Sequence, residues 1–158
     1  MKVIKDRKIV EDAWRLVKDD EAAGPHAIVG LARWNAERDA LVAAGPAGVL
    51  LRSADSPDDV QDLAKAALVA VEFPAFTDGR GYSIARMLRS RLGYRGELRA
   101  VGDVMRDEMF LMSRVGFDSF AVKSTKDIAK ALSAFDDFSV TYQAAADDER
   151  PLFRRVPR

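Results

Sequence analysis

The fold is decided by one apolar run, Leu68-Val69-Ala70-Val71-Glu72-Phe73, which ends at Pro74. A run of this length without alternating polar residues is typical of a strand that is buried on both faces of a parallel sheet. Three further segments, residues 48–51, 97–101 and 117–122, are also expected to be strands. The sequence therefore predicts a sheet of parallel strands built around residues 68–73.

Between these runs the apolar residues recur at helical spacing. Ser56 followed by Pro57 predicts the start of a helix, because serine accepts a hydrogen bond from the first turn and proline fits its first position. Asn35 and Asp103 are expected to cap two other helices in the same way. The expected helices begin at residues 35, 57, 82, 104 and 124 or 125, and they end near residues 44, 67, 92, 115 and 135.

Strands that alternate with helices predict an α/β protein with a mostly parallel sheet, either open and doubly wound or a partial (β/α) barrel. A full barrel of eight units needs about 250 residues, and this chain has 158. We expect a single domain over residues 1–158. Residues 1–25 are expected to form an N-terminal β-hairpin extension with a further strand at residues 14–17. Residues 27–136 would form the α/β core and residues 137–158 a C-terminal tail.

The composition excludes several classes of protein. The chain has 25 basic and 25 acidic side chains, which gives no net charge and argues against a nucleic-acid-binding protein. The longest uncharged stretch, residues 40–51, is too short to cross a membrane. Residues 1–6 lack the apolar region of a signal peptide, so the cytoplasm is the expected location.

Few residues of this chain could hold a metal or act as a nucleophile. It contains no cysteine, which excludes disulfides, cysteine nucleophiles and thiolate-bound clusters. Its one histidine, His26, lies in an expected loop, and the carboxylates lack the spacing of an EF-hand. We therefore expect no metal site, and the sequence identifies no cofactor.

Arginine is concentrated in residues 80–106, which contain seven arginines and no lysine. The only acids in that segment are Glu97 and Asp103. A guanidinium is a planar donor suited to carboxylate, sulfate or phosphate groups. The alternative is an ordinary solvated helix face whose arginines form surface ion pairs.

The loop before the helix expected at residue 82 is the leading candidate site, because ligands of parallel α/β sheets bind at the carboxyl ends of the strands. Gly79 and Gly81 flank Arg80, so positive φ angles could bring free N–H groups toward an anion such as sulfite, sulfate or phosphate. A tight turn in which Arg80 pairs with Asp78 or Asp103 fits equally well. The residues expected to bind the anion or an anionic cofactor are Thr77, Gly79, Arg80, Gly81, Tyr82, Ser83 and Arg106.

Three aspartates near this loop are candidates for acid–base catalysis: Asp78, Asp103 and Asp107. If Asp78 and Asp103 met in one pocket, repulsion between their charges would raise one pKa and create a proton donor. A structural network, with Asp107 paired to Arg106 or Arg80, is the alternative.

Two motifs and the chain's end resemble a bacterial family known as domain of unknown function 934. The motifs are Val71-Glu72-Phe73-Pro74-Ala75-Phe76-Thr77-Asp78-Gly79-Arg80-Gly81-Tyr82-Ser83-Ile84-Ala85-Arg86 and Gly96-Glu97-Leu98-Arg99-Ala100-Val101-Gly102-Asp103-Val104-Met105-Arg106-Asp107, and the ending is Pro151-Leu152-Phe153-Arg154-Arg155. Members of that family are often described as oxidoreductases of sulfite reduction and tend to be encoded beside the sulfite reductase haemoprotein.

The resemblance implies a pathway, assimilatory sulfite or sulfate reduction, with the reductase haemoprotein as a partner. Electron transfer by a chain without cysteine would need a noncovalent cofactor or a partner that carries the redox centre. The first hypothesis is therefore an accessory protein of sulfite reduction with an arginine-lined anion site. The alternatives are a stand-alone enzyme with an aspartate acid–base group, and a structural homodimer.

Overall fold

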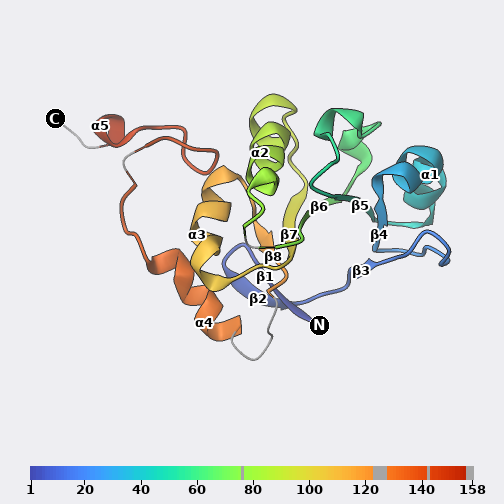
Figure 1. The fold of residues 1–158 in the computed structure, drawn as a ribbon, viewed down its shortest axis with the longest axis horizontal. Helices are drawn as coiled ribbons and strands as arrows, with labels where there is room; N and C mark the ends of the chain where they lie inside the picture. Colours follow the sequence, from blue (N-terminus) through green and yellow to red (C-terminus); the bar gives the residue numbers. More distant parts are fainter. Residues whose placement is uncertain (76, 123–127, 142, 156–158) are drawn as a thin grey trace.

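Eight strands form one sheet in the order β2-β1-β8-β7-β6-β5-β4-β3. The computed structural model describes residues 1–75, 77–122, 128–141 and 143–155. The sheet curls into a half-barrel within a single α/β domain, and helices α1, α2 and α3 lie on one side of it (Figure 1). We call the side toward these helices the outer face and the opposite side the inner face. Among the described helices, none has the length and apolar character needed to cross a bilayer.

The strands have two to six residues and the α-helices four to fourteen. The strands are β1 (Lys2–Lys5), β2 (Lys8–Glu11), β3 (Arg15–Leu16), β4 (Ala27–Gly30), β5 (Ala47–Leu51), β6 (Leu68–Phe73), β7 (Glu97–Gly102) and β8 (Ser119–Phe120). The α-helices are α1 (Leu31–Ala44), α2 (Arg80–Arg86), α3 (Arg106–Val115), α4 (Ile128–Leu132) and α5 (Leu152–Arg155). Single turns complete the set: the 3₁₀ turns η1 (Pro57–Asp59), η2 (Leu63–Lys65) and η5 (Ser133–Asp136), and the π-helical turn η3 (Met87–Arg91).

The sheet is mixed, which corrects the expectation of a mostly parallel sheet. Strands β3 to β8 pair in parallel, whereas β1 runs antiparallel to both of its neighbours, β2 and β8. The expected N-terminal hairpin is present, and Asp6 and Arg7 form its turn with φ angles of 49° and 59°. Two consecutive positive φ angles fit the twist of a two-residue hairpin turn. The further strand, β3, does not extend the hairpin. It pairs with β4 and is the last strand of the sheet on the side away from β2.

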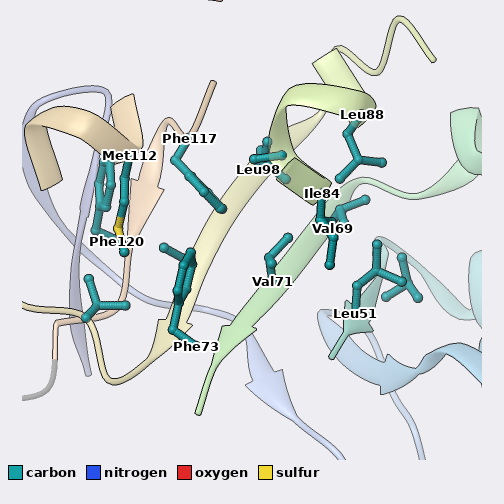
Figure 2. Packing of buried hydrophobic residues seen from close by; sticks show 14 of the residues in the cluster. Leu51, Val69, Val71, Phe73, Ile84, Leu88, Leu98, Met112, Phe117 and Phe120 are labelled. Carbon is teal, nitrogen blue, oxygen red and sulfur yellow. The ribbon is translucent and has the colours of Figure 1, made fainter. Parts of the chain in front are cut away.

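The pairing register assigns the residues of each central strand to the two faces. Leu50, Ala70 and Arg99 are level with one another on β5, β6 and β7, so their side chains share the inner face. Their sequence neighbours point to the outer face, where they pack against α2 and α3. Figure 2 shows this outer core, with the labelled residues Leu51, Val69, Val71, Phe73, Ile84, Leu88, Leu98, Met112, Phe117 and Phe120.

The helix expected over residues 57–67 is wrong, and the structure has the two turns η1 and η2 there. Ser56 does cap the first turn, since its hydroxyl accepts a hydrogen bond from the Asp58 N–H at 3.3 Å. Asn35 then interrupts the segment, because its amide donates to the Asp59 carbonyl at 2.9 Å and accepts from the Gln61 N–H at 3.0 Å. Asn35 therefore lies inside α1, which begins at Leu31, and is not its cap.

The cap expected from Asp103 is also wrong. Helix α3 begins at Arg106, and Met105 precedes it without a side-chain cap. The Asp103 N–H donates to the Phe73 carbonyl at 2.7 Å, so Asp103 is held in the turn that leaves β7. Gly102 makes that turn with a φ of 91°. Of the last expected helix, only the part from residue 128 falls within the described residues, as α4 and η5.

Replacement of Gly102 by alanine should destabilise the fold. A Cβ at this position would clash with the Phe73 carbonyl oxygen, and the φ of 91° disfavours any side chain. We expect Gly102→Ala to lower the free energy of unfolding in urea by about 2 kcal/mol or more.

Gly79→Ala is the matched control, because Gly79 has a helical φ of −77° and a Cβ there would meet nothing within 4 Å. Its free energy of unfolding should stay the same or rise by about 0.5 kcal/mol. Equal effects of the two substitutions would contradict the structural role of Gly102.

Candidate functional site

The loops that follow β5, β6 and β7 lie together at one end of the sheet, the edge formed by the carboxyl ends of the strands, because these three strands are parallel neighbours. Residues 52–53 follow β5, residues 74–79 lead from β6 into α2, and residues 103–105 lead from β7 into α3. All the candidate residues from the sequence belong to these loops or to the first turns of α2 and α3. Thr77 and Ser83 are exposed there.

Asp78 lies between a hydroxyl of the β5 loop and the guanidinium of Arg80. Ser53 donates its hydroxyl to Asp78 Oδ2 at 2.6 Å, and Arg80 donates Nε to Oδ1 at 2.9 Å and Nη2 to Oδ2 at 2.7 Å. These hydrogen bonds, first those of Arg80 and then that of Ser53, hold the pKa of Asp78 well below its usual range. Of the two pairings that the sequence left open for Arg80, the one with Asp78 forms. An Asp78 that stays ionised is a poor proton donor.

The two glycines of this loop act differently from what the sequence predicts. Gly79 has a helical φ of −77°, and Gly81 lies inside α2, so neither supplies the expected positive φ. Gly81 is required for packing: a Cβ there would lie 2.5 Å from the ring of Phe73. The missing side chain lets the first turn of α2 lie directly on the end of β6.

Arg106 is held by a different group of residues. Its guanidinium donates to both carboxylate oxygens of Asp137, at 3.2 and 2.7 Å, and to the hydroxyl of Ser133 at 3.3 Å. Asp107 lies 3.5 Å from the same guanidinium, but its side chain is 88% exposed. Arg106 thus bonds to residues of η5 and the segment after it, while Arg80 bonds within its own loop next to β5. The structure places these two arginines in separate ion pairs.

Glu108 is the carboxyl group of this edge that sequence reasoning missed. Burial raises its pKa, and the nearby charges of Asp103 and Asp107 add to the rise, while a hydrogen bond with the Met105 backbone opposes it. Its Oε2 atom is buried and has no hydrogen-bond partner among the described residues. Burial, and then the charge of Glu108, also raises the pKa of Tyr82 to about 12. Glu108 is therefore better suited than Asp78 to carry a proton at this edge.

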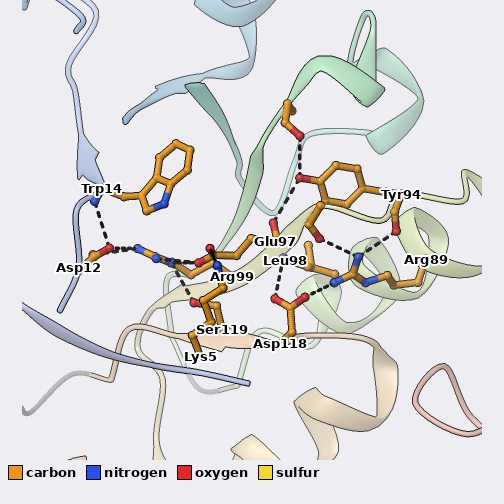
Figure 3. A network of polar contacts seen from close by, with 12 residues as sticks. Lys5, Asp12, Trp14, Arg89, Tyr94, Glu97, Leu98, Arg99, Asp118 and Ser119 are labelled. Atoms are coloured by element: carbon orange, nitrogen blue, oxygen red, sulfur yellow. Dashed lines mark hydrogen bonds and ion pairs between the residues drawn. The ribbon is translucent and has the colours of Figure 1, made fainter. Parts of the chain in front are cut away.

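A second group that the sequence reading missed lies on the inner face and is centred on Arg99 (Figure 3). Arg99 donates Nη1 to both oxygens of Asp12, at 2.9 and 2.8 Å, and Nη2 to Glu97 at 2.7 Å. Lys5 donates to the other oxygen of Glu97 at 2.6 Å. The side chains of Arg99 and Asp12 are each only 3% exposed. Alternate charges at positions 97 and 99 of a strand were a signal for this network, since both side chains must share one face.

The arginine-rich segment is thus mostly engaged in ion pairs within the chain. Within the described residues, five of its seven arginines have a carboxylate partner: Arg80, Arg89, Arg91, Arg99 and Arg106. Arg89 also donates to the backbone carbonyls of Tyr94, Gly96 and Gly116, which fixes the loops that lead into β7 and β8. In the part of the chain that the structure describes, no three His, Asp or Glu residues are grouped to hold a metal ion.

Loss of Arg99 should be costly, because it leaves two buried carboxylates without their main partner. We expect Arg99→Met to lower the free energy of unfolding at pH 7 by about 3–5 kcal/mol. Arg91→Met is the control, since Arg91 and its partner Asp58 are about half exposed and their pair should contribute less than about 1 kcal/mol.

The effect of Arg99→Met should also depend on pH. Burial tends to raise the pKa of Glu97, but hydrogen bonds and charge from Lys5 and Arg99 outweigh it, so the pKa of Glu97 lies below its usual value. Its contribution to stability is present above the pKa of the unfolded chain and is lost as the pH falls through the lower folded value. In Arg99→Met, protonation relieves the unpaired charges, so the difference from the wild type should shrink between pH 7 and pH 5, by urea unfolding. A constant difference would contradict the proposed electrostatic origin.

Comparison with known proteins bears on the two motifs at this edge. A family model described as a bacterial protein of unknown function matches residues 48–153, which span β5 to α5 and include the loops around Arg80 and Arg106. No curated protein matches the chain. The match extends over more than half of the 158 residues and agrees with the resemblance seen in the sequence. The chain therefore belongs to the bacterial protein family of unknown function DUF934.

Proposed function

We propose that this protein is a cytoplasmic accessory protein of assimilatory sulfite and sulfate reduction that acts with the sulfite reductase haemoprotein. The proposal is supported by the resemblance of residues 71–86 and 96–107 to a family described in connection with sulfite reduction. Both stretches lie within the matched residues 48–153. In the fold they come together as the neighbouring strands β6 and β7 and the loops that follow them.

The observation that carries the proposal is the way in which Arg80 is held. Two of its nitrogens are fixed by Asp78, which is itself held by Ser53, yet 65% of the Arg80 side chain remains exposed. A guanidinium that is already oriented loses little conformational freedom when it binds a second acceptor. The exposed side of Arg80 is suited to an oxyanion such as sulfite, sulfate or phosphate, or to an acidic group of a partner or cofactor.

A binding role agrees better with the residue inventory than catalysis of electron transfer by this chain alone. The sequence has no cysteine and a single histidine. Side chains of these two types are the usual protein ligands of iron–sulfur clusters and of haem iron. The electrons of sulfite reduction would then be carried by the partner, and this protein would act on its assembly, its substrate supply or its stability.

Two alternatives remain proposals of lower rank. A stand-alone enzyme would need a proton donor, and the raised pKa of Glu108 makes this group more suitable than Asp78. Asp103 and Asp107 would then act through their charges on Glu108. A purely structural homodimer would make no use of the oriented guanidinium of Arg80.

Sulfate should stabilise the wild-type protein more than it stabilises Arg80→Ala. Sulfate stabilises folded proteins generally, so the informative quantity is the difference between variants in the midpoint of thermal unfolding. We expect this midpoint to rise more in sodium sulfate than in sodium chloride of equal ionic strength, and the excess to disappear in Arg80→Ala. Arg86→Ala is the matched control, because Arg86 is an exposed arginine of the same helix. An excess that persists in Arg80→Ala would argue against the anion site.

A tagged copy expressed in the native host should recover the sulfite reductase haemoprotein. The recovered amount should fall in Arg80→Ala, stay unchanged in Arg86→Ala, and decrease as the salt concentration rises, because exposed charges are screened. Absence of the reductase from complexes of the folded wild-type protein would contradict the accessory role. Sulfate binding through Arg80 without recovery of the reductase would favour a stand-alone enzyme. If neither sulfate binding nor the reductase were observed, the structural dimer would be the remaining hypothesis.

A further inference from the structure

The inner face of the half-barrel contains a cavity of about 370 Å³ that lies apart from the loops of the proposed anion site. It is lined by residues of the N-terminal segment and of the inner face: Met1, Asp12, Trp14, Leu16, Ile28, Ala70, Arg99, Val101, Gly102, Ala121 and Val122. Small ligands generally bind in pockets of about 300–1,000 Å³ that are mostly apolar and contain a few fixed polar groups. This cavity meets both conditions.

Small residues on this face leave room for the cavity. Ala70 of β6 and Ala121, which directly follows β8, have only a methyl side chain where they line it. Trp14 reaches over the sheet from the N-terminal segment and packs against the inner cluster of Ile28, Leu50, Leu68 and Ala70. The opening is apolar as well, since Leu16 lines the cavity and is 59% exposed.

The charged groups in the wall cancel each other. Asp12 and Arg99 are each 3% exposed and are bound to one another through two hydrogen bonds. Asp12 also accepts the backbone N–H of Trp14 at 3.1 Å, which holds the backbone of that tryptophan beside the pair (Figure 3). Glu97 and Lys5 extend the network with one further charge of each sign. The wall is therefore neutral, and a charged ligand would lose its hydration without gaining a free counter-charge.

We propose that this cavity is a binding site for a small, uncharged, mainly apolar molecule with aromatic rings. The apolar floor and Trp14 supply the contact area, because aromatic rings pack well against an indole and against flat apolar surfaces. The buried pair of Arg99 and Asp12 fixes the N-terminal segment as one wall, so the site is formed before the ligand arrives. The proposal does not depend on the anion site or on a role in sulfite reduction.

A pair of fluorescent probes with the same rings tests both the site and its neutrality. N-phenyl-1-naphthylamine is uncharged, and 1-anilinonaphthalene-8-sulfonate carries one sulfonate. Titration of the folded protein with each probe should give saturable binding of one molecule of the uncharged probe per chain. The sulfonate should bind about tenfold more weakly or worse, because its charge must be desolvated against a neutral wall.

Two matched substitutions locate the bound probe. Ala121→Phe fills the inner-face cavity, whereas Ala64→Phe fills a different, mostly apolar cavity of about 420 Å³ that is lined by residues 63, 64, 66 and 67 and by residues 92–96. Ala121→Phe should weaken binding of the uncharged probe by about tenfold or more, and Ala64→Phe should leave it unchanged. Circular dichroism and thermal unfolding check that both variants fold. If Ala121→Phe does not fold, Leu16→Asp at the exposed mouth replaces it, with the same expected loss.

Three results would overturn the proposal. The first is the absence of saturable binding of the uncharged probe to the wild-type protein. The second is unchanged affinity in a folded Ala121→Phe or Leu16→Asp variant, or a loss in Ala64→Phe instead. The third is stronger binding of the sulfonate than of the uncharged probe, which would show that the wall attracts anions. Loss of Arg80 should affect none of these measurements, so this test is independent of the proposed function.

Discussion

Parallel strands that are buried on both faces, as β5 and β6 are here, must be covered on both sides, and the structure of this protein follows from how each face is covered. On the outer face helices do this, with Phe73 of β6 under α2 and Leu98 of β7 in the same core. On the inner face no described helix contributes to the cluster around Leu68 and Ala70, and the N-terminal segment packs there through Trp14. The curled sheet leaves room for this segment and for a cavity beside it.

Polar contacts keep the N-terminal segment in place. Asp12 and Arg99 are 87 residues apart in sequence, and their ion pair joins the segment after β2 to the centre of the sheet. Buried ion pairs contribute little net stability when compared with apolar replacements, but they are specific, because any other arrangement leaves a charge buried alone. In this protein the pair fixes where the N-terminal segment crosses the inner face.

The sequence was a good guide to the strands and a poorer guide to what joins them. The run at residues 68–73 coincides with β6, because burial on both faces demands apolar residues, and its one charged residue, Glu72, stands where the strand is only half-buried. The helix expected at residue 57 failed because Asn35, distant in sequence, takes the backbone groups of Asp59 and Gln61. The cap expected from Asp103 failed because α3 begins at Arg106, which puts Met105 at the N-cap position. Tertiary hydrogen bonds such as those of Asn35 override local preference and cannot be read from a single segment.

At the candidate site the position of the residues followed from the sequence, and their pairing did not. Parallel connections predict that the carboxyl ends of neighbouring strands lie together. They do not predict the orientation of the side chains, because Arg80 is oriented by its ion pair with Asp78 and Arg106 by its ion pair with Asp137. Glu108 escaped notice because its unusual pKa comes from burial. Burial is a property of the assembled fold.

The place of β1 between β2 and β8 has a consequence for how the chain is made. A ribosome releases β1 first, yet the strand it pairs with across the sheet, β8, emerges more than 100 residues later. Until then the hairpin has no neighbour on one side, and Ile4 of β1 lacks its partner Phe120. Completion of the sheet is thus a late event of biosynthesis, and the nascent chain is exposed to chaperones and to self-association until β8 has been translated.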